Sequence, residues 1–131
     1  MKLNPYLLFN GNSEEALNTY QKIFNGKIEM LSRFGEQAFG EAYKDKIMHA
    51  RLVWDDNIIM ISDGMPDTPI KSGDNVDLCL GFTDEQQTHS IFEQLAEGGN
   101  IKMPLEKQFW GALYGQVTDK FGINWMLNCE L

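Results

Sequence analysis

The chain repeats one order of secondary-structure signals at an offset of about seventy residues. Each copy begins with an apolar, β-rich run, passes through a polar turn into a segment with helical spacing, and ends in two further apolar strands. Because each copy must bury its apolar sheet face, the repeat predicts an α+β fold of paired β-α-β-β modules. The signals lie at 6–9, 12–26, 48–54 and 58–62 in the first copy and at 78–82, 83–99, 113–118 and 124–128 in the second.

Both helices are predicted from their start and stop signals. Asn12-x-x-Glu15 and Thr83-x-x-Gln86 have the pattern of a capping box, in which a side-chain oxygen accepts a hydrogen bond from a free backbone N–H. A glycine soon after each helical segment is the residue best suited to the left-handed conformation that ends a helix. The two helices are therefore expected to start where the preceding strands stop.

The length and composition predict a single domain. A chain of 131 residues with 43% apolar side chains is long enough to bury a core of its own. Segments rich in Gly, Pro, Asp and Lys, without apolar periodicity, are typical of loops. We expect two modules, at about 1–66 and 75–131, joined by a loop at 67–74.

The charge distribution limits the partners that the chain can have. Its net charge is −8 and it has no cluster of Lys and Arg, which argues against nucleic acid. Asn10-Gly11-Asn12 interrupts the first apolar run, so that neither a signal peptide nor a membrane span is predicted. We expect a cytoplasmic protein with no membrane partner. Cys79 and Cys129 lie in strand-like segments and are expected to be small buried side chains rather than a disulfide.

The motifs also resemble a known family. Paired modules of this kind are similar to those of the vicinal oxygen chelate superfamily, which includes glyoxalases, extradiol dioxygenases and the fosfomycin and bleomycin resistance proteins. The resemblance narrows to the PhnB-like branch, whose members are sometimes labelled 3-demethylubiquinone-9 3-methyltransferase. It rests on Pro5-Tyr6, Phe9-x-Gly11-Asn12, Ala16-x-x-x-Tyr20, His49-Ala50, Met60-x-Ser62-Asp63-x-Met65-Pro66, Phe109-Trp110 and Thr118-Asp119-Lys120-Phe121-Gly122-x-x-Trp125-Met126-x-Asn128.

The methyltransferase label has no support in the residues. A doubly wound methyltransferase needs a glycine-rich turn between its first strand and helix, to hold the methyl donor. The Gly98-Gly99 pair instead follows a predicted helix. The resemblance implies curled, cup-like mixed sheets of the glyoxalase/bleomycin resistance/dihydroxybiphenyl dioxygenase fold.

The resemblance also implies where a metal would be bound. Enzymes of the superfamily hold a divalent ion with His, Gln or Glu from the first and last strand of each module. A hard or borderline divalent ion needs carboxylate or imidazole ligands, so we expect no metal and no cofactor here. The corresponding positions by strand register are Pro5, Met60, Leu78 and Met126, and a one-residue slip would bring in Asn4, Asp77 or Trp125.

The cup that remains is predicted to bind a small molecule. Aromatic and Met side chains with a few polar groups are typical of such a pocket. The proposed lining is Tyr6, His49, Met60, Ser62, Phe109, Trp110, Tyr114, Met126 and Asn128, with Asp63 beside it.

Several of these residues also have a plainer interpretation. Met60 and Met126 are apolar strand residues, which usually belong to the core. His49 is as easily a hydrogen-bonded structural histidine as an acid or base. Asp63 could serve the turn into Gly64. Trp110 is the strongest candidate, because a large aromatic side chain at a strand edge is otherwise partly exposed.

Two functions follow from this interpretation. The first is metal-independent binding of a small, partly apolar or aromatic compound. The second is an enzyme, an isomerase or lyase, in which His49 and Asp63 move a proton. A phosphonate or related anion follows from the family label alone, and Arg33 and Arg51 are the side chains that could pair with it.

The chain is also expected to form a homodimer. Its two helices are too few to cover both faces of two sheets, and a symmetric partner would cover what they leave exposed. The superfamily resemblance implies that a ligand cavity could then draw residues from both subunits.

Overall fold

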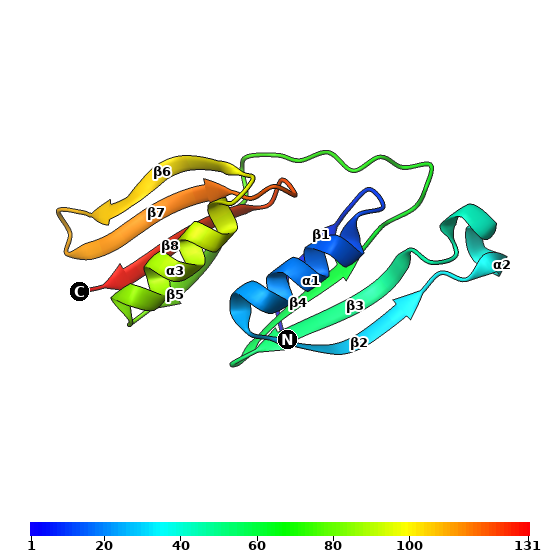
Figure 1. Ribbon diagram of the computed structural model, residues 1–131, viewed down its shortest axis with the longest axis horizontal. Helices are drawn as coiled ribbons and strands as arrows, with labels where there is room; N and C mark the ends of the chain where they lie inside the picture. Colours follow the sequence, from blue (N-terminus) through cyan, green and yellow to red (C-terminus); the bar gives the residue numbers. More distant parts are fainter. The chain divides into compact units, whose positions relative to one another are not determined.

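The computed structural model describes residues 1–131 in full, and the chain divides into two compact units, Met1–Lys71 and Ser72–Leu131. Each unit contains one four-stranded mixed sheet with a 12-residue helix packed on one of its faces (Figure 1). The predicted α+β fold with curled, mixed sheets is confirmed. No helix is long and apolar enough to cross a membrane, which takes about twenty apolar residues.

In the first unit the sheet has the order β1-β4-β3-β2, with β1 parallel to β4 and the other neighbours antiparallel. The helix α1 follows β1, and a short helix and a 3-10 turn connect β2 to β3. The elements are β1 Tyr6–Leu8, α1 Ser13–Phe24, β2 Lys27–Arg33, α2 Glu36–Phe39, η1 Glu41–Tyr43, β3 Ile47–Trp54 and β4 Asn57–Ser62.

The second unit repeats this plan in the order β5-β8-β7-β6, with β5 parallel to β8. Its helix α3 contacts all four strands of the sheet. The elements are β5 Leu78–Phe82, α3 Glu85–Ala96, β6 Asn100–Lys107, β7 Ala112–Thr118 and β8 Asn124–Glu130.

Each sheet has four strands, and the sequence predicted residue ranges for only three of them. The strands without a predicted range are β2 and β6. Both lie at the edge of their sheet, and most of their side chains are exposed. A strand without a buried face has no alternation of apolar and polar residues, so its sequence resembles that of a loop.

The core of each unit lies between its helix and its sheet. In the first unit, Leu17 and Tyr20 of α1 are buried with Leu52 and Ile61 of the sheet. Apolar side chains at helical spacing meet apolar side chains at strand spacing, and their burial supplies the main folding free energy of the unit. In the second unit the buried side chains are Ile91, Phe92 and Leu95 of α3 with Val117, Trp125 and Leu127 of the sheet.

The helix starts lie within a residue of the predicted sites, but the caps differ. Asn12 is at the N-cap position of α1, and its side chain makes no capping hydrogen bond. The first free N–H of that helix, on Ser13, is instead bound by the distant Asp63. In α3 the N-cap is Asp84 rather than Thr83, and its carboxylate accepts hydrogen bonds from two backbone N–H groups.

Candidate functional site

The face of the first sheet that lies opposite α1 holds three of the predicted ligand residues. Side chains alternate along a strand, so the row next to the buried Leu7, Ala50 and Ile61 faces the other way. Strand register places Tyr6 beside Met60, and Met60 beside Arg51. We call the residues Tyr6, His49, Arg51 and Met60 the open face of the first unit.

A hydrogen bond joins two members of this open face. The Tyr6 hydroxyl lies 2.8 Å from His49 Nδ1, and the two rings are tilted with their centroids 5.5 Å apart. Tyr6 is 43% exposed and His49 is half-buried, so both side chains are accessible to a ligand. A phenol and an imidazole in contact can donate to, accept from or exchange a proton with a polar group.

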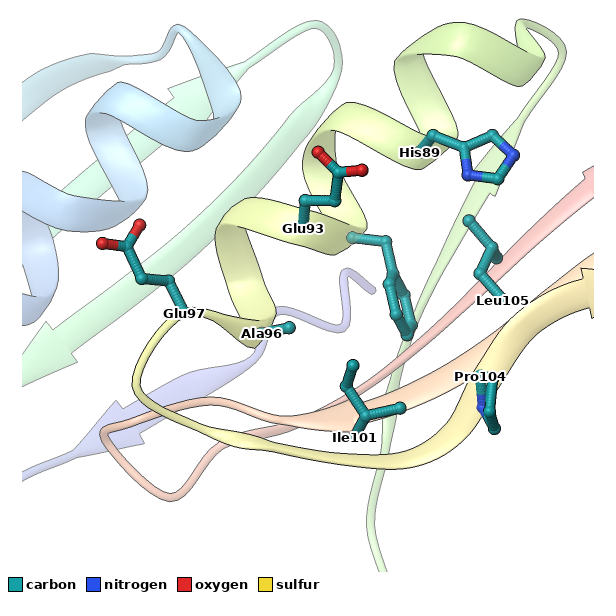
Figure 2. Close-up of a pocket in the computed structure, with 8 residues that line it drawn as sticks. His89, Glu93, Ala96, Glu97, Ile101, Pro104 and Leu105 are labelled. Atoms are coloured by element: carbon teal, nitrogen blue, oxygen red, sulfur yellow. The ribbon is translucent and has the colours of Figure 1, made fainter.

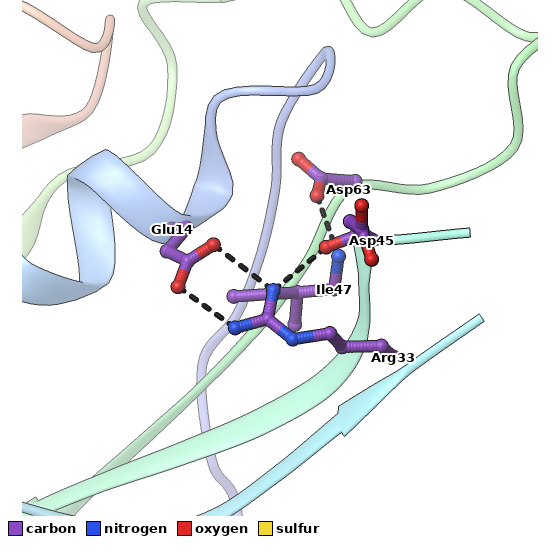
Figure 3. A network of polar contacts seen from close by, with 5 residues as sticks. All are labelled: Glu14, Arg33, Asp45, Ile47 and Asp63. Carbon is purple, nitrogen blue, oxygen red and sulfur yellow. Dashed lines mark hydrogen bonds and ion pairs between the residues drawn. The ribbon is translucent and has the colours of Figure 1, made fainter. Parts of the chain in front are cut away.

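The two arginines considered for an anion lie in different surroundings. Arg33 donates from Nη1 and Nη2 to the two carboxylate oxygens of Glu14, each at 2.9 Å, and from Nη1 to the Asp45 carbonyl (Figure 3). This hydrogen-bonded ion pair lowers the pKa of Glu14 and raises the pKa of Arg33. Arg51 has a weaker partner, since its Nη2 is 3.8 Å from Glu29, and its enclosed Nε has no hydrogen-bond acceptor. Arg51 is therefore the cation that this face offers.

Asp63 has a structural role in the first unit. Its Oδ1 accepts a hydrogen bond from Ser13 N at 2.9 Å, and its Oδ2 accepts one from Ile47 N at 2.8 Å (Figure 3). The Asp63 side chain is buried. The pKa of the nearby Tyr43 phenol is raised by the burial of Tyr43 itself and by the negative charge of Asp63. Both carboxylate oxygens thus bind backbone N–H groups.

The proposed acid–base pair is not brought together. The observed side-chain partner of His49 is Tyr6, and that of Asp63 is the backbone. Ser62 is also used locally, because its buried hydroxyl accepts a hydrogen bond from Gly64 N at 3.0 Å.

The second unit has a corresponding open face, opposite α3. Register places Tyr114 beside Asn128 and Gln116 beside Met126, on the face that the buried Leu127 does not occupy. The Tyr114 hydroxyl donates to Met126 Sδ at 3.4 Å and accepts a hydrogen bond from Gln116 Nε2 at 3.0 Å. Gln116 is a member that the sequence did not single out, although its position two residues from Tyr114 in one strand indicates the same face.

Two aromatic side chains extend this second face at the turn before β7. The Trp110 ring lies edge-on to the Tyr114 ring at a centroid distance of 5.8 Å, and the Phe109 ring lies 5.1 Å from Trp110. Trp110 is 53% exposed and Phe109 is 97% exposed. Large aromatic surface of this kind on a protein is typical of a contact site.

The metal positions inferred from the superfamily need a correction of one residue. Tyr6, not Pro5, lies beside Met60, and Cys79, not Leu78, lies beside Met126. The observed positions lie one residue after Pro5 and Leu78, whereas the alternative with Asn4 and Asp77 lies one residue before them. Phenol and thioether groups are poor ligands for a hard divalent ion. The structure contains no group of three or more His, Cys, Asp or Glu side chains that could hold a metal ion.

The cysteines are both unpaired, and they differ in burial. Cys129 is fully buried as expected, whereas Cys79 is exposed, which contradicts the prediction for that residue. Cys79 lies on the edge strand β5, where a strand residue can be apolar without being covered.

The model of the protein family described as 3-demethylubiquinone-9 3-methyltransferase matches residues 1–128. The chain belongs to this PhnB-like family. Protein PA1353 from Pseudomonas aeruginosa is similar to it in structure, with a TM-score of 0.90, 40% identity, and coverage of 99% of this chain and 98% of that one. A Bacillus cereus protein described as a putative 3-demethylubiquinone-9 3-methyltransferase, PhnB protein, has a TM-score of 0.83 at 26% identity and covers 98% of this chain and 99% of its own.

A more distant structure supports the superfamily fold. The fosfomycin resistance protein FosX from Listeria monocytogenes, complexed with Mn(II) and sulfate, has a TM-score of 0.65 at 15% identity, and the match covers 100% of this chain and 93% of FosX. This PhnB-like chain therefore has the fold of the vicinal oxygen chelate superfamily, as its motifs predicted.

The methyltransferase description of the family is not matched by a donor site in this chain. Gly98 and Gly99 follow α3, and Gly98 has the left-handed φ of 73° that ends a helix. Neither sheet is the open parallel sheet on which doubly wound enzymes bind a nucleotide-like donor.

The structural role of Asp63 can be tested with Asp63→Asn. The amide has only one oxygen acceptor, so one of the two buried N–H groups loses its partner, and we expect a loss of about 1–3 kcal/mol in the free energy of unfolding. Urea unfolding measures it, with Asp67→Asn in an exposed loop as the control. Equal stability of the two variants would contradict the structural role.

Proposed function

We propose that this PhnB-like chain is a metal-independent binding protein for a small, partly apolar or aromatic molecule, of the glyoxalase/bleomycin resistance type. The main support is the composition of the two open faces. Each combines apolar Met and aromatic surface with a few hydrogen-bonding groups, and neither contains a set of carboxylate and imidazole ligands. An apolar surface supplies affinity, and sparse polar groups fix the orientation of a ligand.

The face of the second unit is the better candidate for binding an apolar or aromatic molecule. Trp110 and Tyr114 are in edge-to-face contact, so a third ring can stack on either of them. Met126 lies beside Tyr114 and can adapt its unbranched side chain to an irregular surface. Gln116 and Asn128 on the same face provide amide donors and acceptors.

The face of the first unit, taken by itself, is suited to a polar or anionic molecule. The Tyr6–His49 pair offers a hydrogen bond, and Arg51 offers a positive charge that Glu29 only partly offsets at 3.8 Å. A carboxylate or phosphonate oxygen on a ligand would find a bidentate donor in this guanidinium. The weak pairing of Arg51 with Glu29 therefore supports an anionic ligand, such as the phosphonate that the family label suggests. This support is stronger than that from the sequence alone.

The same pair supports an enzyme as the second candidate function. Tyr6 and His49 in direct contact could transfer a proton to or from a small metabolite, as an isomerase or lyase requires. Asp63 is not the second group of this pair, because its carboxylate binds the backbone. We favour binding, because one imidazole–phenol pair without an adjacent carboxylate is a modest acid–base site.

We place this activity in the cytoplasm. Both cysteines are free thiols, and one of them is exposed, which is typical of a reducing compartment. The net charge of −8 argues against nucleic acid as a partner.

The contribution of Trp110 gives a direct test of the binding site. A thermal-shift screen of metabolites and antibiotics identifies a ligand, which at a hundred times its Kd raises stability by about 2.7 kcal/mol. We expect Trp110→Ala to weaken binding of that ligand by about 1–3 kcal/mol, because an aromatic anchor is removed. The melting temperature should stay close to that of the parent, because the side chain is 53% exposed.

The matched control is Phe39→Ala, which removes a similarly exposed aromatic side chain from α2 in the other unit. Calorimetric titration compares the three proteins. An unfolded Trp110→Ala variant would place Trp110 in the core, and an unchanged affinity would remove it from the binding site.

We also propose that the chain is a homodimer. Edge strands and large exposed apolar side chains remain in the single chain and need a cover. Examples are Met30 at 48%, Met48 at 45% and Met103 at 39% exposure. Such an interface should bury at least about 1,200 Å².

The mass in solution tests this proposal. Light scattering at micromolar concentration should return twice the 15.0 kDa of the chain. A mass of 15.0 kDa would rule out the dimer and require any ligand site to be built within one chain.

A further inference from the structure

A groove runs between α3 and the edge strand β6, on the side of the second sheet that the helix covers (Figure 2). It is therefore separate from the open face described above. Its volume is about 600 Å³, which lies in the range of small-molecule sites. The lining consists of Phe92, Ala96, Ile101, Pro104 and Leu105, with His89, Glu93 and Glu97 on the helix side.

The strand wall of the groove is built by an irregularity in β6. The pairing with β7 shifts between Ile101 and Met103 and again before Glu106. At Gly115 of β7 a side chain is excluded, since a Cβ there would lie 2.9 Å from Leu105 Cα and 2.9 Å from a Phe92 ring carbon. The strand can therefore approach the helix closely at this point. The result is an apolar groove whose lining includes the buried Phe92.

The helix wall of the groove carries two exposed carboxylates, those of Glu93 and Glu97. Glu93 lies in the last turn of α3, and Glu97, four residues further on, is the C-cap residue that follows the helix. Neither forms an ion pair, and α3 contains no Lys or Arg. Both carboxylates also lie at the C-terminal end of the helix, where the helix dipole is negative and disfavours anions. A cation beside them would relieve both repulsions.

We propose that this groove binds a small organic cation, a primary or quaternary ammonium group on an apolar body. The apolar body contacts Phe92, Ile101 and Leu105, and the ammonium group lies beside Glu93 and Glu97. An apolar groove with charges of one sign along one rim selects amphiphiles of the opposite charge.

The geometry favours a small molecule over a peptide or a second copy of the chain. The helix face from His89 to Glu97 rises only about 12 Å, the length of a phenylalkylamine. Pro104 has no N–H and the register of β6 is irregular, so this edge offers a poor ladder for an added strand. In a symmetric contact at this groove, a second copy would bring its own Glu93 and Glu97 against the same acidic rim.

Amide NMR titration of the full chain tests the proposal, with 2-phenylethylamine as the cation and 2-phenylethanol as its neutral counterpart. We expect saturable shifts of the α3 and β6 amides with the amine, at an affinity about tenfold or more above that of the alcohol. Added salt should weaken the amine and leave the alcohol unchanged. Equal binding of the two probes, or no saturable shift with the amine, would overturn the proposal.

Three variants locate the site. The double variant Glu93→Gln with Glu97→Gln should lose the preference for the amine, and Ile101→Ser should weaken both probes. Ile101 is 49% exposed, so the fold should tolerate the change. Glu85→Gln in the first turn of α3 is the control and should bind like the parent. If Glu85→Gln loses as much affinity for the amine as the double variant, the preference depends on the net charge of the chain and not on this groove. That result would refute the site.

A second copy of the chain or a peptide in the groove would give a different result in the same titration. Shifts of the groove amides with protein concentration alone would indicate a second copy. A short acetylated Phe-Lys peptide that binds more tightly than the amine would indicate a peptide partner. Either result would contradict the small-molecule assignment.

Discussion

A buried carboxylate ties the helix of the first unit to its sheet. Asp63, at the end of β4, binds the first N–H of α1 through one oxygen and the first N–H of β3 through the other, while its own N–H donates to the Ile47 carbonyl. Helix and sheet are thus fixed at one point, and the row of side chains on the opposite face of the sheet is fixed with them. The second unit uses Asp119 in a related way, because its carboxylate binds Phe121 N, Ile123 N and the Trp125 indole. Burying a charged group costs much free energy unless its hydrogen bonds are complete, and both carboxylates meet that condition.

The sequence predicted the two-module plan because the patterns that encode it are long. Helical spacing in α1 and α3 and the apolar strands β3, β4, β7 and β8 depend on burial, which leaves a strong periodicity. It did not predict the edge strands β2 and β6, which bury little, or the cap that Asp63 provides from fifty residues away. A contact over that distance leaves no local signal.

The arrangement of the proposed lining residues could be predicted only in part. Trp110, Tyr114, Met126 and Asn128 were expected together, and strand alternation and ring contacts do place them on one side of the second sheet. The pairing of His49 with Tyr6 rather than Asp63, and the one-residue shift at Met60 and Met126, required the strand register. Register depends on contacts between strands that are distant in sequence, and a slip of one residue exchanges the two faces.

We propose that this chain works without a metal ion, and its metal content tests that proposal most directly. The residues nearest the expected ligand positions are Tyr6, Met60, Cys79 and Met126, which supply a phenol, a thiol and two thioethers in place of the carboxylate and imidazole groups of the metal-dependent enzymes. Elemental analysis of protein purified without chelator should find no divalent transition metal in proportion to the chain. A content of one Mn, Ni, Zn or Fe ion per chain would contradict the proposal.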